Sequence, residues 1–408
     1  MTEAPQRPPS PFTPGSPVPV ELFVGRAPQI QQIMRSIEQS VAGRQQNVFL
    51  LGERGVGKTS VASLLRHWAY TKHQVVGAHV FLGGVRSLPE LVRRIFDSLL
   101  KVTHTEKWFD KVRSLFGNII TDVGLFGVSV GFAPADRDLD QLLRQFPQSM
   151  HQIVLSLHDD VKGLLIILDD LDAISAEPDF ANWYKSFVDE VATHFERYPV
   201  TVLLIGLPEI VDSLAALQPS LPRIFTIIEL QRLSNDEVTD FLQKAFAKVN
   251  LPVDADAMDL MVRFSSGVPV IMHEIGDATY WGNADEKIDH RDGLVGVISA
   301  AGRIGRKYLD PQVYRAIRSK SYRSILRKLA LGERALDRNF TRREVAQHLT
   351  EREKRVFDNF LRRLRQLGVI ELDRESGTGC YRFVNDIFPV YVYMEATRSV
   401  EETKPANT

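Results

Sequence analysis

The stretch Gly52 to Thr59, which reads Gly-Glu-Arg-Gly-Val-Gly-Lys-Thr, decides how this chain folds. It fits the pattern G-x-x-x-x-G-K-[ST] without a gap. Residues 47–51 before it predict a buried strand, and residues 60–68 after it predict a helix. A strand, a glycine-rich loop and a helix aim backbone N–H groups and a helix N-terminus at a phosphate chain. The sequence therefore predicts a site for a nucleoside triphosphate with Mg²⁺, in preference to a chance glycine-rich turn.

The side chains of this loop have distinct expected roles. Lys58 should reach the β- and γ-phosphates, and the hydroxyl of Thr59 should ligate Mg²⁺. The glycines allow the backbone to approach the phosphates closely. The predicted nucleotide contacts in the loop are Gly52, Gly55, Val56, Gly57, Lys58, Thr59 and Ser60.

Residues 164–170 form a second motif, an apolar run that ends in Asp169 and Asp170. A strand of this kind places both carboxylates at the carboxyl edge of a parallel sheet, beside the loop. We expect Asp169 to hold Mg²⁺, largely through water, and Asp170 to orient or deprotonate the attacking water. The alternative is a strand end that is capped by solvated acids.

The apolar run of this second motif and three other runs are typical of buried parallel strands, and helical stretches separate them. These runs are residues 75–82, 164–168, 200–205 and 224–230. Their alternation with helices predicts an α/β fold in which helices cover both faces of a parallel sheet. Arg223 precedes the last run. It is either an arginine finger that reaches a neighbouring subunit's phosphates or a surface side chain near a turn.

The domain organisation follows from changes in composition and period along the chain. We predict a flexible proline-rich lead-in over residues 1–20, a nucleotide-binding core over 21–232 and a helical lid over 233–308. A winged-helix domain over 309–398 and a disordered tail over 399–408 follow. Residues 103–140 interrupt the core, and their Gly-rich alternation indicates a β-hairpin that serves an oligomer interface or a plain surface insertion.

The predicted winged helix consists of three helices followed by a two-stranded hairpin. Residues 303–365 hold 19 Lys and Arg against 7 Asp and Glu, a net formal charge of +12. This concentration predicts contact with a polyanion such as DNA, or else a solvated face that the neighbouring domain balances. The candidate DNA contacts lie on the third helix, over residues 351–367, and are Arg352, Arg355, Arg362, Arg363 and Arg365.

The remaining composition is that of a globular protein, with 44% hydrophobic and 25% charged residues. A single cysteine, Cys380, excludes an intrachain disulfide and fits a reducing compartment. No signal segment and no apolar run long enough for a bilayer is evident. We therefore expect a cytoplasmic location and no membrane contact.

Together these motifs resemble those of the AAA+ and STAND ATPases, in particular their initiator-like (origin-recognition-like) branch, over about residues 21–395. The resemblance implies ATP as the nucleotide, and it implies that Val24, Gly25 and Arg26 flank the adenine. It also implies a nucleotide contact at Pro269, because residues 267–269 are similar to the Gly-x-Pro element of STAND proteins. The simpler interpretation is an ordinary helix N-terminus with a proline near its first position. Val270 stands about where initiators carry a sensor arginine.

Two functions from different classes are compatible with these features. One is an ATP-hydrolysing switch that forms homo-oligomers and acts on a nucleic-acid or nucleoprotein complex, with a possible protein partner. The other is a signalling or defence ATPase whose winged helix is regulatory and binds no DNA. A nucleotide-binding scaffold with little hydrolysis is a third interpretation, because the turn over residues 206–209 offers no Asn, Ser or Thr to sense the γ-phosphate.

Overall fold

The computed structural model describes residues 7–102, 120–121, 131–132, 136–156, 161–315, 319–332 and 336–401. The chain divides into two units, one formed by Arg26–Gln231 and the other by Met1–Gly25 together with Arg232–Thr408. The sequence predicts the core over residues 21–232, of which residues 21–25 belong to the second unit. The second unit also holds residues 233–308 and 309–398, predicted as lid and winged helix. None of the described helices is long and apolar enough to span a bilayer.

A five-stranded parallel sheet in the order β2-β5-β6-β1-β7 forms the centre of the first unit. The strands are β1 (Gln46–Gly52), β2 (Val75–Phe81), β5 (Gly163–Asp169), β6 (Val200–Gly206) and β7 (Thr226–Leu230). All five predicted strands and the α/β class are therefore confirmed. The last strand begins two residues later than predicted, because a 3-10 turn, η4 (Leu221–Ile224), precedes it.

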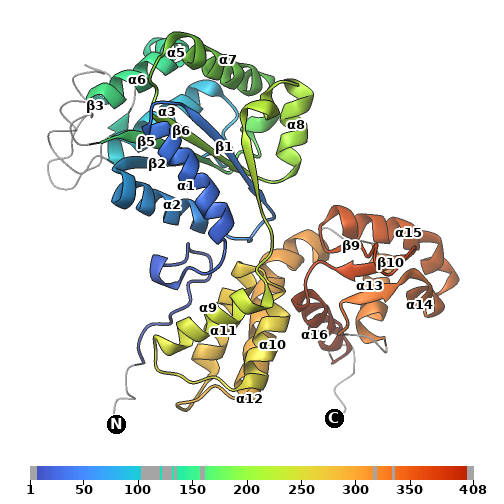
Figure 1. Ribbon diagram of the computed structural model, residues 1–408. Coiled ribbons are helices and arrows are strands. Elements are labelled where there is room, and N and C mark those ends of the chain that lie inside the picture. Colours follow the sequence, from blue (N-terminus) through green and yellow to red (C-terminus); the bar gives the residue numbers. More distant parts are fainter. Residues whose placement is uncertain are drawn as a thin grey trace. The chain divides into compact units, whose positions relative to one another are not determined.

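Helices cover both faces of this sheet (Figure 1). One face is covered by α1 (Ala27–Val41) and α2 (Lys58–His73). Apolar residues from the other face form one core with α3 (Leu88–Lys101), α6 (Phe146–Ser156) and α7 (Pro178–His194). The three central strands β5, β6 and β1 are buried on both sides, as their continuous apolar sequences require. The shorter helices α5 (Asp136–Arg144), η3 (Ile174–Ala176) and α8 (Glu209–Leu217) complete the layer.

The predicted insertion is described only in part. Strand β3 (Ile120–Thr121) pairs antiparallel with β4 (Gly131–Phe132), which agrees with the expected hairpin. The rest of residues 103–135 lies outside the described residues, so the role of this segment stays a prediction.

Four helices form the lid of the second unit: α9 (Asn235–Ala247), α10 (Ala255–Ser265), α11 (Pro269–Gly282) and α12 (His290–Ile304). A π-helical continuation, η5 (Gly305–Tyr314), follows. The start of α9 is fixed by a capping box, in which Ser234 and Glu237 each satisfy the other's backbone N–H group. Such reciprocal bonds define where the lid begins.

The proline-rich segment packs against this lid from Arg7 onward, so our expectation of a flexible lead-in up to residue 20 is wrong for residues 7–20. Phe12 is only 3% exposed, and its ring lies edge-on to Phe246 with the centroids 4.9 Å apart. The guanidinium of Arg7 donates to the carbonyls of Tyr280 and Asn283 at the end of α11. The short turn η1 (Val20–Leu22) then leads toward the core. Aromatic burial therefore holds a segment whose composition alone indicates disorder.

The winged helix contains the three predicted helices α13 (Lys320–Leu331), α14 (Arg342–Gln347) and α15 (Glu351–Gln366). Its antiparallel sheet has the order β8-β10-β9, from β8 (Asn339–Thr341), β9 (Ile370–Leu372) and β10 (Cys380–Phe383). Thr341 forms the expected capping box with Glu344. The sequence did not predict β8 or the final helix α16 (Ile387–Glu401), which packs against α12 and α13.

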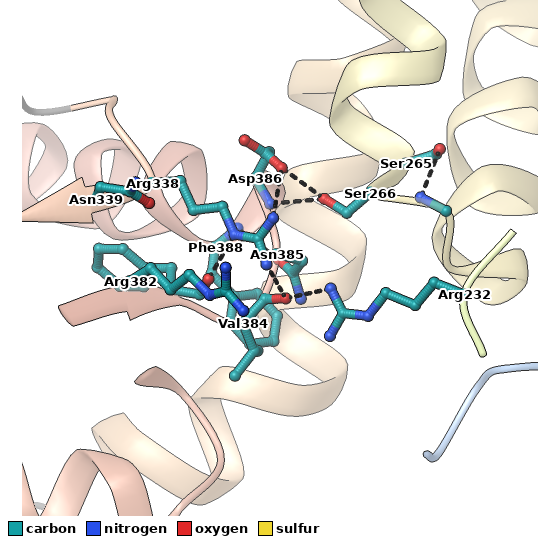
Figure 2. A network of polar contacts seen from close by, with 12 residues as sticks. Arg232, Ser265, Ser266, Arg338, Asn339, Arg382, Val384, Asn385, Asp386 and Phe388 are labelled. Atoms are coloured by element: carbon teal, nitrogen blue, oxygen red, sulfur yellow. Dashed lines mark hydrogen bonds and ion pairs between the residues drawn. The ribbon is translucent and has the colours of Figure 1, made fainter. Parts of the chain in front are cut away.

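A polar network joins the lid to the winged helix within this unit (Figure 2). Arg232, which enters the lid, donates to the carbonyl of Val384 at 2.6 Å. Arg338 donates to the same carbonyl at 3.1 Å and to that of Phe383 at 2.7 Å. Burial lowers the pKa of Arg338, although Asp386 acts in the opposite direction. The two arginines thus satisfy backbone carbonyls where β10 ends.

Candidate nucleotide site

The loop that follows β1 has the backbone geometry of an anion cradle. Gly55 and Gly57 have φ values of +80° and +97°, a region that favours glycine. A Cβ atom on Gly52 would lie 2.8 Å from a methyl carbon of Val56 and 3.0 Å from the carbonyl oxygen of Leu230. Helix α2 begins immediately after Gly57, so its N-terminus faces the loop. The seven predicted residues thus run from the last residue of β1 through the loop into the first turn of α2.

The ammonium group of Lys58 lies over this turn. Its Nζ donates to the carbonyls of Gly52 at 2.6 Å and Glu53 at 2.9 Å. Burial lowers the pKa of Lys58, while the carboxylate of Asp169 acts to raise it. A cation held by neutral carbonyls can exchange these partners for phosphate oxygens, which are stronger acceptors.

Thr59 and Asp169 come together as expected for a metal site. The Thr59 hydroxyl donates to Oδ2 of Asp169 at 2.9 Å, although α2 and β5 are far apart in the sequence. Asp169 is 5% exposed. Both residues offer hard oxygen atoms, the donors that Mg²⁺ prefers. Among the described residues, no group of three His, Cys, Asp or Glu forms a metal site by itself, so a cation here would also need phosphate or water oxygens.

Asp170 adopts a different conformation from its neighbour. It is exposed and has a φ of +64°, which is uncommon for a residue with a side chain. Its backbone N–H donates to Oδ1 of Asp169 at 3.0 Å. A Cβ atom on Gly83 would lie 2.9 Å from Oδ2 of Asp170, so the turn after β2 passes beside this carboxylate. The structure thus keeps one carboxylate buried and presents the other to solvent.

Arg26, the first residue of the first unit, makes a contact that the sequence did not predict. The resemblance implies that Arg26 flanks the adenine, but its guanidinium is buried and donates to the carbonyl of Val56 at 3.3 Å. Arg26 therefore contacts the backbone of the phosphate loop. Val24 and Gly25 belong to the second unit. A Cβ atom on Gly25 would overlap Glu237 of α9, so this glycine allows close packing against the lid. Nucleotide contact by these three residues stays a prediction.

Two polar residues near the site were not assigned a role from sequence. Arg54 of the loop forms an ion pair with Asp172 at 2.8 Å. His79 of β2 contacts Asp169, with 3.0 Å between its Nε2 and Oδ2. A histidine inside an otherwise apolar strand was the available signal, because a buried polar group needs a partner.

Arg223 lies at the opposite end of the sheet from the phosphate loop. It is exposed on η4, before the amino end of β7, and β7 runs parallel to β1 with Thr226 opposite Val48 and Leu230 opposite Gly52. The four residue steps from Thr226 to Leu230 separate the two ends of β7 by about 13 Å. Arg223 is therefore not placed to contact the nucleotide of its own chain, and a role toward another copy stays a prediction.

Pro269 is the first residue of α11, as the simpler of our two interpretations expects. The preceding Gly267 has a φ of +68°, and its carbonyl accepts the N–H of Leu233 at 2.8 Å. A Cβ on Gly267 would lie 2.2 Å from the carbonyl oxygen of Leu233. This turn therefore anchors the start of the lid. It lies in the second unit, and a nucleotide contact by Pro269 stays a prediction.

All five predicted arginines of α15 are exposed. At 100° per residue, Arg352, Arg355, Arg362 and Arg363 share one sector of about 100°, whereas Arg365 lies outside it. Asp358 of the same helix pairs with Arg342 of α14 at 2.8 Å, which neutralises an acid beside this sector. The helix thus presents concentrated positive charge to solvent.

Comparisons with known proteins agree with this geometry. Residues 22–202 match the AAA ATPase domain family. The fold is similar to that of the ORC2 protein of Aeropyrum pernix in its ADPNP–ADP complexes, with a TM-score of 0.53, 13% identity and coverage of 93% of this chain and 95% of that chain. It is also similar to a Walker-type ATPase of Pyrococcus abyssi, with a TM-score of 0.51, 18% identity and coverage of 91% and 96%. No curated protein matches the sequence.

Proposed function

We propose that this chain binds and hydrolyses ATP with Mg²⁺, because residues 22–202 match the AAA ATPase domain family and carry a P-loop. The observation that carries the proposal is the meeting of Thr59 and Asp169 beside Lys58. Two elements remote in sequence, the start of α2 and the end of β5, place a cation, a hydroxyl and a carboxylate at the carboxyl edge of one sheet. Open α/β sheets bind their ligands at this edge.

The residues present fit a magnesium–triphosphate pair. Mg²⁺ is commonly held by one or two carboxylates together with phosphate oxygens and water. Thr59 and Asp169 would hold it, and Lys58 would neutralise the phosphates. When bound, the ion supplies charge stabilisation for the phosphoryl group as it is transferred.

Asp170 is our candidate for activating the attacking water. Its carboxylate is exposed, whereas that of Asp169 is engaged by Thr59 and by the backbone of Asp170. A free carboxylate can accept a proton from water or orient it, and an engaged one serves the metal. Two adjacent aspartates thus divide the two tasks through their environments.

ATP hydrolysis must drive some further process. We favour two statements about it: the protein acts on nucleic acid or a nucleoprotein complex, and it does so as a homo-oligomer. The exposed arginine sector of α15 supports the first statement, because this helix is the one that winged helices insert into the major groove. The exposed position of Arg223 is compatible with the second, because it leaves this side chain accessible to another copy. The alternative is a signalling or defence ATPase, which the anchoring of the winged helix to the lid by Arg232 and Ser266 supports.

Substitution of Lys58 tests the nucleotide site. Lys58→Ala should weaken ATP binding by about 10- to 100-fold, which corresponds to the 1.5–3 kcal/mol of a charge-assisted hydrogen bond. Titration with a fluorescent ATP analogue measures the change. Lys72→Ala, at an exposed position near the end of the same helix, is the matched control and should bind as the wild type does. Unchanged affinity in folded Lys58→Ala protein would refute the proposed function.

A further inference from the structure

The carboxylate of Asp169 has a partner on β2 that none of the motifs includes. The side chain of His79 is 5% exposed, and its Nε2 lies 3.0 Å from Oδ2 of Asp169. In the parallel pairing of the two strands, His79 lies opposite Ile167 and Phe81 opposite Asp169. Residues two apart on a strand share a face, so His79, Phe81 and Asp169 lie on the same side of the sheet.

The direction of this hydrogen bond follows from chemistry. An ionised carboxylate only accepts hydrogen bonds, so Nε2 of His79 carries the proton and donates it. The ring of Phe81 stacks on the imidazole with the centroids 4.3 Å apart and the planes at 24°. Phe81 is itself 57% exposed and covers the histidine from solvent. The imidazole is therefore fixed between a ring and a carboxylate.

These contacts hold Asp169 from three directions. Its Oδ2 accepts from both Thr59 at 2.9 Å and His79 at 3.0 Å, and its Oδ1 accepts the backbone N–H of Asp170 at 3.0 Å. Thr59 and the Asp170 backbone belong to the two motifs. His79 is the additional donor, and it comes from the outermost strand of the sheet next to β5.

A purely structural explanation accounts poorly for this residue. The other described residues of β2 are apolar, and an apolar side chain at position 79 would fill the site without a hydrogen-bond requirement. A carboxylate that ligates a metal is commonly oriented by a hydrogen-bond donor behind it. The position of His79 matches this second role.

We propose that His79 is a positioning residue that orients the Asp169 carboxylate toward Mg²⁺. The inference rests on the proposed Mg–ATP site and adds a residue of β2 to it. The turn after this strand lies beside the same site, because a Cβ atom on Gly83 would lie 2.9 Å from Oδ2 of Asp170. Strand β2 and its exit thus form a wall along both aspartates.

Three variants separate the donor from the packing. His79→Gln keeps an N–H donor at a similar reach, and His79→Phe keeps a ring against Phe81 without the donor. His79→Leu removes the donor with a smaller side chain, in case the phenyl ring disturbs the fold. His151→Gln is the control, because His151 packs on Tyr198 before the amino end of β6, away from the aspartates.

The measurement is the affinity for a fluorescent ATP analogue, first in EDTA and then across a Mg²⁺ series. In EDTA all variants should bind within about twofold of the wild type. His79→Phe and His79→Leu should need about 10- to 100-fold more Mg²⁺ for half-saturation, whereas His79→Gln should need less than about threefold more. The electron paramagnetic resonance spectrum of bound Mn²⁺ should change in the first two only.

Two results would overturn the inference. One is a wild-type Mg²⁺ dependence in His79→Phe and His79→Leu. The other is an equal loss of affinity for the ATP analogue in all three variants, in EDTA as well as in Mg²⁺, which would indicate that His79 serves packing alone. Failure of the proposed function looks different, because the wild-type protein itself would then show no Mg²⁺-dependent binding of ATP.

Discussion

Ser266 and Asp386 hydrogen-bond to each other in both directions. The Ser266 hydroxyl donates to Oδ2 of Asp386 at 2.8 Å and accepts the backbone N–H of Asp386 at 2.8 Å (Figure 2). Ser266 ends α10 with a φ of +51°, next to the turn that precedes α11, and Asp386 precedes α16. One hydroxyl therefore joins the lid to the last helix of the winged helix.

Removal of this hydroxyl should destabilise the second unit. We expect Ser266→Ala to lower the free energy of unfolding by about 1–3 kcal/mol, because two half-buried polar groups lose a partner. Ser266→Gly should cost less, since glycine relieves the positive φ. Denaturant titration measures both. Ser213→Ala, whose hydroxyl only bonds within α8, should change stability by less than about 0.5 kcal/mol, and an equal effect of both alanine variants would contradict the assignment.

The docked N-terminal segment depends on Phe12. Phe12→Ala should lower the free energy of unfolding by about 2–3 kcal/mol, the contribution of one fully buried aromatic side chain. Gly276→Ala should have a similar effect, because its Cβ would lie 2.2 Å from the Phe12 ring. In the Phe12→Ala background Gly276→Ala should be nearly neutral. Additive effects in this double-mutant cycle would show that the two residues do not interact.

The stability of the second unit should fall in mild acid through His273. Burial lowers the pKa of His273 to about 4, against the opposing effect of Asp277, and Nδ1 accepts the backbone N–H of Thr13 at 3.1 Å. In the unfolded chain His273 therefore takes up a proton near pH 6.5, whereas in the folded chain it takes up a proton only near pH 4. Stability is complete above pH 6.5 and declines as the pH falls toward 4.

A variant isolates this contribution. His273→Asn keeps an acceptor near the position of Nδ1 but does not titrate. Between pH 7 and pH 4.5 the wild type should lose about 2–3 kcal/mol more stability than His273→Asn. Denaturant titrations at the two pH values measure the difference, and equal losses would show that His273 titrates normally.

Asp170→Asn should separate hydrolysis from binding. If Asp170 activates water, ATP turnover by the Asp170→Asn variant should fall by about 10²- to 10⁴-fold, while its affinity for ATP stays within about threefold of the wild type. Steady-state phosphate release measures the rate. Asp172→Asn is the control, because Asp172 is engaged with Arg54. If wild type and Asp170→Asn hydrolyse ATP equally slowly, the protein is a nucleotide-binding scaffold.

The arginine sector of α15 predicts salt-dependent DNA binding. Four phosphate contacts would give a slope of about −3.5 in log affinity against log salt, and Arg362→Ala or Arg363→Ala should each reduce it by about one. Duplex titrations at several salt concentrations measure the slope, with Arg44→Ala in the first unit as control. Absence of binding at low and high salt would favour the signalling or defence alternative.

The sequence by itself determined the phosphate loop, the five strands and the three helices of the winged helix. These features are local, since glycine spacing, apolar runs and capping boxes such as Thr341 with Glu344 act over a few residues. The pairing of Thr59 with Asp169 was also predictable, because parallel strands end at a common edge of the sheet.

Only the tertiary structure decided the other contacts. It placed His79 against Asp169, turned Arg26 toward Val56 and docked Phe12 on the lid. Each contact joins residues that are at least 30 positions apart, and none leaves a periodic pattern in the sequence. The roles of the proline-rich segment and of the histidine in β2 depend on the side chains that they contact. Burial and hydrogen-bond partners are properties of the folded chain, so these roles could not be predicted from the sequence.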